Sequence, residues 1–106
     1  MSEALRTFGY EVHTAAGANE ALGLMARARF ELLLCDLRLS GVRGTELVEK
    51  VRRLDPELAV IILTGVPSDD HDVRRLRENG IAVLHKPVQL ARLHTAVVEV
   101  LRTLNP

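Results

Sequence analysis

Two short, unbroken apolar runs constrain most strongly how this chain can fold. The first is Glu-Leu-Leu-Leu-Cys at residues 31–35, and the second is Ala-Val-Ile-Ile-Leu at residues 59–63. Neither alternates between apolar and polar residues, which is typical of strands buried on both faces, as in a parallel sheet. A β-type segment at residues 10–15 and a short run at 81–84 continue the pattern. We therefore expect a parallel sheet covered by helices.

Segments with apolar residues at helical spacing separate these expected strands. The expected helices are one that ends at Gly9, then residues 20–29 after Asn19, a helix from Thr45 to Leu54, one from Ser68 or Asp69 to Asn79-Gly80, and residues 90–104. Gly41 and Gly44 mark a loop. Strict alternation of helix and strand predicts an α/β doubly wound sheet with right-handed crossovers. In such sheets the ligand site lies beyond the carboxyl ends of the strands.

Composition excludes several classes of function. The 106 residues suffice for one domain, and 14 basic residues balance 14 acidic ones, which argues against a direct nucleic-acid binder. Cys35 is the single cysteine, so no internal disulfide can form. No apolar run is long enough to span a bilayer, and the first residues lack the apolar stretch of a signal peptide. The expected location is therefore the cytoplasm, without a membrane partner.

Three polar residues stand directly after separate apolar strands: Asp36, Thr64 and Lys86. Because parallel strands end at one edge of their sheet, these side chains are expected to converge. A carboxylate there can act as a nucleophile, an ammonium can offset the charge of a transferred group, and a hydroxyl can donate to one of its oxygens. The pattern predicts phosphoryl chemistry. The histidines (His13, His71, His85, His94) show no metal-ligand spacing.

The segments 32–44, 60–65 and 83–88, together with the weaker segment 9–22, resemble the receiver domain of two-component response regulators. The resemblance covers essentially the whole chain. It implies a flavodoxin-like doubly wound sheet with the family strand order 2-1-3-4-5, strand 1 being absent from this chain. It also implies that residues 1–106 form one receiver domain, incomplete at its N-terminus and without an output domain.

The resemblance also implies a role for each strand-end residue. Asp36 would accept a phosphoryl group from a histidine kinase or phosphotransfer protein, Thr64 would be the switch hydroxyl, and Lys86 would contact the phosphoryl group. Lys86-Pro87 matches a peptide that is commonly cis in the family, and Val83 stands where the family has an aromatic switch residue. Family members bind magnesium through the phosphoacceptor, an acidic pair and a backbone carbonyl, which here would be that of Arg38. Because the acidic pair is missing, we expect magnesium binding to be weak or absent.

Alternatives remain at this point. A pseudo-receiver would be an interaction module that takes no phosphate. An aspartate-nucleophile phosphatase typically needs a second acid two residues after the nucleophile, where Arg38 stands, so we do not expect an enzyme. Asp69 and Asp70 are expected to stabilise a helix start rather than to replace the acidic pair. Absence of a central strand would leave unpaired edges, so we expect a homo-oligomer. The downstream partner is left open.

Overall fold

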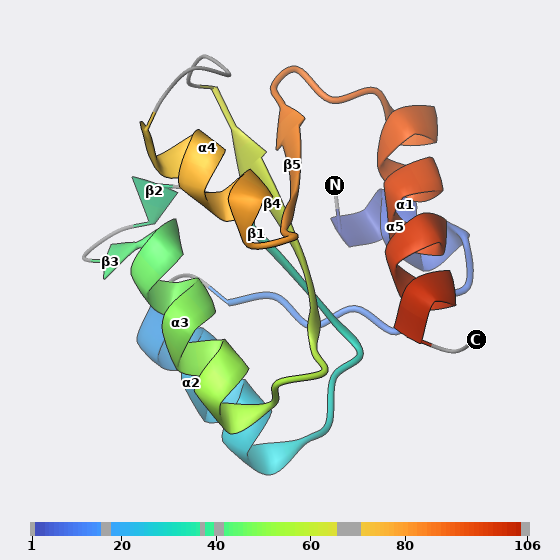
Figure 1. The fold of residues 1–106 in the computed structure, drawn as a ribbon. Coiled ribbons are helices and arrows are strands. Elements are labelled where there is room, and N and C mark those ends of the chain that lie inside the picture. Colours follow the sequence, from blue (N-terminus) through green and yellow to red (C-terminus); the bar gives the residue numbers. More distant parts are fainter. Residues whose placement is uncertain (1, 16–17, 37, 40–41, 66–70, 105–106) are drawn as a thin grey trace.

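The fold is an open parallel sheet with helices packed on both of its faces (Figure 1). The computed structural model describes residues 2–15, 18–36, 38–39, 42–65 and 71–104. Its helices are α1 (Ser2–Thr7), α2 (Ala18–Arg27), α3 (Gly44–Leu54), α4 (His71–Glu78) and α5 (Leu90–Leu104). Its strands are β1 (Leu32–Asp36), β2 (Arg38–Leu39), β3 (Val42–Arg43), β4 (Ala59–Thr64) and β5 (Ala82–His85).

Strand β4 lies in the middle of the main sheet, whose order is β1-β4-β5. Both pairings are parallel, with Leu32 beside Ala59 in one and Thr64 beside His85 in the other. Every residue of β4 is buried, whereas four of the five residues of β1 are partly exposed and only Cys35 is buried. The expectation of parallel strands buried on both faces is thus confirmed most fully by β4.

Apolar side chains form one core on each face of the sheet. Helices α2, α3 and α4 cover one face, where Val51, Ile62 and Val73 lie fully buried. Helices α1 and α5 cover the other face, where Ile61 packs with Leu93. Successive residues of a strand point to opposite faces, so the neighbours Ile61 and Ile62 serve different cores. Because successive residues of β4 enter the cores on opposite faces of the sheet, the strand requires an uninterrupted apolar run.

Glycine ends two helices as the sequence predicts. Gly9 follows α1 with φ 91°, and Gly80 follows α4 with φ 78°. Residues that carry a Cβ atom rarely adopt such positive φ values. After α4, the N–H groups of Gly80 and Ile81 donate to the carbonyls of Arg77 and Leu76, which is the Schellman arrangement. Helix α5 covers the predicted residues 90–104, and α3 ends at Leu54, directly before Asp55-Pro56.

The prediction of a strand at residues 10–15 was wrong. The segment forms no ladder with β1, although Tyr10 and Val12 pack against the core on the α5 side. The backbone groups of an extended segment need hydrogen-bond partners. Here a side chain supplies one of them, because the Arg6 guanidinium donates to the Val12 carbonyl at 2.8 Å. Without a neighbouring strand, the β-type composition of the segment is not sufficient to make it part of the sheet.

Other boundaries also differ from the expectation. The predicted loop around Gly41 and Gly44 contains the short antiparallel pair β2–β3, with Arg38 beside Arg43, and Gly44 begins α3. Asn19 lies inside α2, and Thr45 inside α3, rather than before them. The predicted roles of Ser68, Asp69 and Asp70 fall outside the described residues. In the part of the chain that the structure describes, no helix has the length and apolarity needed to cross a membrane.

Candidate functional site

Asp36 and Lys86 meet beyond the carboxyl ends of the strands. Asp36 is the last residue of β1, and Lys86 directly follows β5, with β4 lying between these strands. The Lys86 ammonium donates a hydrogen bond from Nζ to Oδ2 of Asp36. Both side chains are partly exposed, at 46% and 39%, so the pair lies at the surface and can be reached from solvent. The Lys86-Pro87 peptide is cis.

Thr64 occupies the end of β4, between the other two strand ends. It is 1% exposed, and its carbonyl accepts a hydrogen bond from the Lys86 N–H at 2.7 Å. The same β4 strand places Leu63 beside Asp36 through the ladder with β1. The structure therefore brings Asp36, Thr64 and Lys86 to one edge of the sheet, as the sequence predicts.

The described residues at this edge do not fit a magnesium ion well. Magnesium prefers octahedral oxygen coordination with one or two carboxylates, and receiver domains typically bind it. Here the Asp36 carboxylate already binds the Lys86 ammonium, a competing cation. Arg38 begins β2, and nothing groups three histidine, cysteine or acidic side chains in the ranges that the structure describes.

Cys35, the neighbour of Asp36 in β1, is a buried thiol. Its Sγ lies 3.1 Å from the Asp36 carbonyl oxygen, to which the S–H can donate. Burial, and to a smaller extent the negative charge of Asp36, raises the pKa of this thiol to about 11. Cys35 is therefore a protonated strand residue at neutral pH, and a poor nucleophile.

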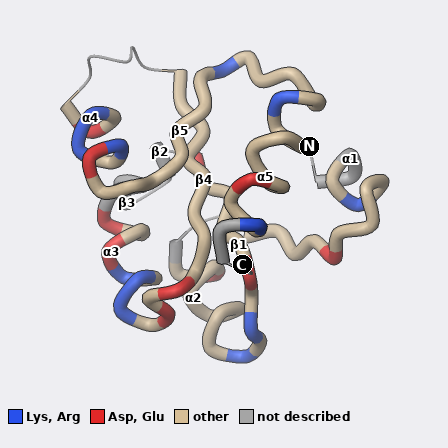
Figure 2. Tube along the Cα trace, turned by 45° about the vertical axis from the view of Figure 1, so that its right-hand side comes forward, with Lys and Arg blue, Asp and Glu red and all other residues tan. Residues whose placement is uncertain are grey.

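One contact beside the site was not visible in the sequence. The Arg77 guanidinium of α4 lies 3.0 Å from Nε2 of His85, the residue directly before Lys86. Arginines 74, 75 and 77 of α4 are all exposed, and basic residues account for the blue stretches of α4 in Figure 2. Arg77 also bridges α4 to the end of β5. Eight residues separate the two side chains, and no periodicity relates a helix residue to a strand residue, so no local signal predicts this contact.

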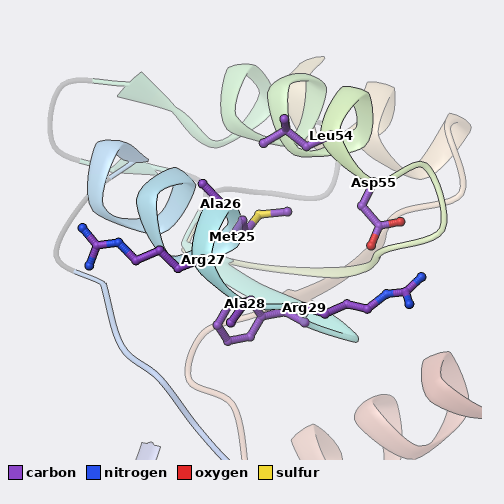
Figure 3. A pocket seen from close by; sticks show the side chains of 8 residues that line it. Met25, Ala26, Arg27, Ala28, Arg29, Leu54 and Asp55 are labelled. Carbon is purple, nitrogen blue, oxygen red and sulfur yellow. The ribbon is translucent and has the colours of Figure 1, made fainter.

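A hollow of about 420 Å³ lies elsewhere, between the ends of α2 and α3 (Figure 3). Met25, Phe30, Leu54 and Asp55 are among the residues that line it. None of Asp36, Thr64 and Lys86 contributes to its wall. Most of its lining consists of alkyl, aromatic and arginine side chains, without a nucleophile beside a base. The hollow is therefore not the candidate site.

Comparisons with known proteins identify the family to which this chain is similar. Residues 1–98 match the family described as response regulator receiver domain. A response regulator receiver protein of Anaeromyxobacter is 41% identical over 93 residues, which cover 88% of this chain and 39% of that protein. The response regulator protein PilR of Pseudomonas aeruginosa is 34% identical over 96 residues, 91% of this chain and 22% of that protein. The chain thus spans two fifths or less of the length of these relatives.

A solved structure shares the fold. The crystal structure of a CheY-like response regulator receiver domain protein from Methanospirillum hungatei superposes with a TM-score of 0.86 at 33% identity. The superposition covers 96% of this chain and 82% of that one. This similarity supports the flavodoxin-like α/β class that the sequence predicts.

Proposed function

This chain belongs to the response regulator receiver domain family, whose members act in phosphorelay signal transduction, and we propose that Asp36 is its phosphoacceptor. The observation that carries the proposal is the hydrogen bond from the Lys86 ammonium to the Asp36 carboxylate at the carboxyl ends of the strands. A carboxylate held beside a cation at an exposed sheet edge can take up a phosphoryl group whose charge the cation offsets.

The proposed step transfers a phosphoryl group from a phosphohistidine of the partner. A carboxylate oxygen of Asp36 attacks phosphorus, the nitrogen–phosphorus bond breaks, and an acyl phosphate forms on Asp36. The Lys86 ammonium then neutralises phosphoryl oxygens instead of the carboxylate. Lys86 is anchored for this role through its own N–H, which donates to the Thr64 carbonyl at 2.7 Å.

Thr64 is proposed as the residue that senses the phosphoryl group. Its side chain is buried at the end of the central strand, so a hydroxyl that turned toward a phosphoryl oxygen would alter packing between β4 and its neighbours. Such a rearrangement can be passed to a partner-binding face, because tightly packed interiors transmit small displacements. Signalling by this route needs no substrate turnover, so we propose a switch rather than an enzyme.

The partners that follow from this chemistry are a histidine kinase or phosphotransfer protein and an unidentified downstream protein. We propose that they meet the chain in the cytoplasm, with neither membrane nor nucleic acid in direct contact. Association of two copies of the chain is a separate proposal, because it rests on a sheet edge and not on Asp36.

Incubation with acetyl phosphate, followed by intact-mass measurement, tests the phosphoacceptor. We expect a mass increase of one phosphoryl group that is lost on treatment with hydroxylamine, which cleaves acyl phosphates. The variant Asp36→Asn is expected to show no increase, while Asp72→Asn, which changes an acid of α4, should behave as the wild type. Phosphorylation that persists in Asp36→Asn would contradict the assignment.

The shortage of carboxylates favours a second candidate, the pseudo-receiver. Among the described residues no group of three histidine, cysteine or acidic side chains surrounds a possible cation site, and Lys86 already binds the Asp36 carboxylate. We propose that magnesium binding is weak, so that phosphorylation is slow and depends little on magnesium concentration. No mass increase at any magnesium concentration, with intact secondary structure, would favour an interaction module. A rapid, magnesium-dependent increase would contradict the proposal of weak binding.

A further inference from the structure

His85 stands between α4 and two residues of the strand-end site. It is the last residue of β5, its Cα lies beside that of Thr64 in the ladder with β4, and Lys86 follows it directly. The N–H of Lys86 donates to the Thr64 carbonyl at 2.7 Å, which ties the two strand ends together beyond this pair. A side chain that holds His85 in place therefore also affects the position of Lys86.

The His85 side chain lies on the face of the sheet that α4 covers. Val83 packs against the core on this face, and Leu84 belongs to the core on the α5 face. Because successive residues of a strand point to opposite faces, His85 returns to the face of Val83. The same alternation places the Thr64 side chain there, two residues after Ile62. The side chains of His85 and Thr64 are therefore neighbours on one face.

Helix α4 is a firm base for the guanidinium that meets this ring. Its residues Val73 and Leu76 are buried, so the helix is packed against the sheet. Arg77 follows Leu76, and its carbonyl accepts a hydrogen bond from the Gly80 N–H at 3.0 Å. The exposed Arg77 reaches Nε2 of His85 with its guanidinium, at 3.0 Å. The contact therefore links a packed helix to the end of β5.

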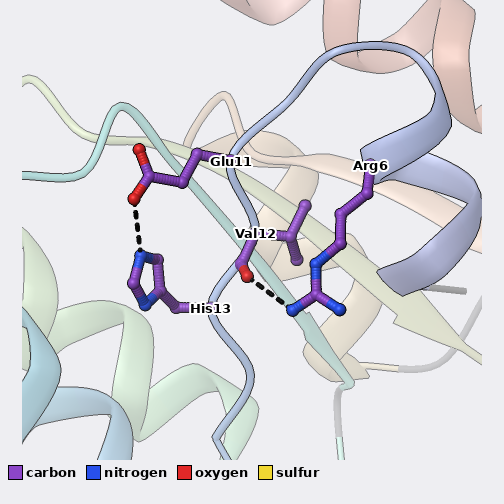
Figure 4. Close-up of polar contacts among 4 residues, drawn as sticks. All are labelled: Arg6, Glu11, Val12 and His13. Carbon is purple, nitrogen blue, oxygen red and sulfur yellow. Dashed lines mark hydrogen bonds and ion pairs between the residues drawn. The ribbon is translucent and has the colours of Figure 1, made fainter.

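The chemistry of the two groups fixes how this contact is made. A guanidinium carries only donors, so Nε2 of His85 must be the acceptor, and the proton of the neutral ring is then on Nδ1. His13 shows the opposite arrangement, because its Nε2 lies 3.2 Å from Oε1 of Glu11 (Figure 4). A carboxylate only accepts, so this nitrogen of His13 must carry a hydrogen. The contact with Arg77 is thus specific for one form of the His85 ring.

We propose that Arg77 is a positioning residue. By donating to His85, it holds the end of β5 in the place from which the Lys86 ammonium reaches the Asp36 carboxylate. Val83, on the same face of β5, has an aliphatic side chain that cannot form such a bond with α4. A small displacement of the β5 end would change how well the ammonium meets a phosphoryl group. This role of Arg77 rests on the proposed function, because it is exercised on the same phosphoacceptor site.

The rate of phosphoryl uptake from acetyl phosphate, followed by intact mass, tests this role. Arg77→Met should slow uptake by about 10-fold, less than the loss of Lys86 itself, because the ammonium remains but is held less well. The matched control Arg74→Met changes another exposed arginine of α4 and should leave the rate unchanged. Equal rates in the wild type and in Arg77→Met would overturn the proposal.

Variants of His85 and Lys86 separate positioning from a general structural effect. His85→Leu should slow uptake as much as Arg77→Met, and the double variant should be no slower than either, because both remove one contact. His85→Gln carries an oxygen that can accept from the guanidinium, so it should recover most of the rate lost in His85→Leu. In Lys86→Met, the further change Arg77→Met should have no effect. Additive losses in the first double variant would contradict the contact, and additive losses in the second would contradict a role exercised through Lys86.

Nitrogen-15 NMR of the unphosphorylated chain tests the contact without any phosphoryl transfer. In the neutral ring of His85, Nε2 is expected to give the resonance of a nitrogen without hydrogen, whereas Nε2 of His13 carries one. The Lys86 amide resonance should shift in Arg77→Met and stay unchanged in the control variant. A hydrogen on Nε2 of His85, or a Lys86 amide that Arg77→Met leaves unchanged, would overturn the positioning role. If the wild type takes up no phosphoryl group while these spectra are as expected, the assignment of Asp36 fails and the contact stands.

Discussion

Lys86 Nζ donates a hydrogen bond to Asp36 Oδ2 although fifty residues separate the two along the chain. The central strand β4 lies between the strands that carry them, so the Lys86 side chain reaches across the end of β4 to Asp36. The contact follows from the parallel topology, because strands running in the same direction deliver their last residues to the same edge.

Replacement of this lysine should affect chemistry far more than stability. Both members of the pair are partly exposed, and such ion pairs contribute at most about 1 kcal/mol. We expect Lys86→Met to change the free energy of unfolding by less than about 1 kcal/mol. Phosphorylation by acetyl phosphate should slow by about 100-fold, the usual effect of removing one group that stabilises developing charge. Lys50→Met on α3 is the control and should leave the rate unchanged.

The two neighbouring isoleucines of β4 should be equally costly to truncate, although they serve different cores. Ile61 and Ile62 are each 0% exposed. Replacement of either by alanine should lower the free energy of unfolding by about 2–5 kcal/mol, measured by urea denaturation. Leu54→Ala, at a side chain that is 62% exposed, should cost less than about 0.5 kcal/mol. A small effect at one isoleucine only would contradict a core on both faces.

Gly80 and Gly23 should respond to alanine with opposite signs. A methyl group meets no atom within 4 Å at either position, so the backbone alone decides. Gly80→Ala places a side chain at φ 78° and should cost about 1–2 kcal/mol. Gly23 lies inside α2, where alanine should stabilise the chain by about 0.5–1 kcal/mol. Thermal unfolding of both variants gives the comparison, and equal shifts in Tm would refute it.

The buried thiol of Cys35 should make the chain less stable at high pH. Its folded pKa is raised from 9.0 to about 11 by burial and then by the charge of Asp36. Between these values the unfolded chain loses the thiol proton while the folded chain keeps it, so stability falls as pH rises from 9 toward 11. Below pH 9 the stabilisation is complete.

The control for this effect is Cys35→Ala, in which the thiol is gone. Other groups also titrate above pH 9, so the relevant quantity is the difference between the two pH profiles of unfolding free energy. We expect the wild type to fall more steeply than Cys35→Ala. Parallel profiles would show that the thiol titrates alike in the folded and unfolded chains.

The elements predicted well from the sequence are those whose signal is local. The run Ala-Val-Ile-Ile-Leu specifies β4 because it has no polar face to offer to water, and Asn79-Gly80 specifies the end of α4 through backbone geometry. The convergence of Asp36 and Lys86 is also predictable, since topology alone brings them to one edge.

The elements predicted poorly depend on neighbours. Residues 10–15 have strand-like composition, but a strand requires a second backbone to bond, which composition cannot reveal. Strands β2 and β3 are too short to show a recognisable alternation of apolar and polar residues in the sequence. The contact of Arg77 with His85 joins a helix to a strand, and it becomes visible only when both are packed.

The shared central position of β4 also governs the order in which the sheet can assemble. Each of its two pairings is parallel, so α3 must fit within the chain between β1 and β4, and α4 within the chain between β4 and β5. Neither pairing can begin as a tight hairpin. Each requires closure of a long loop, and the entropy lost in that closure is offset only after the hydrogen bonds of the ladder have formed. We therefore expect the helices to begin forming before the strands pair. Substitutions in β4 should slow refolding, whereas substitutions on the outer edge of β1 should chiefly speed unfolding.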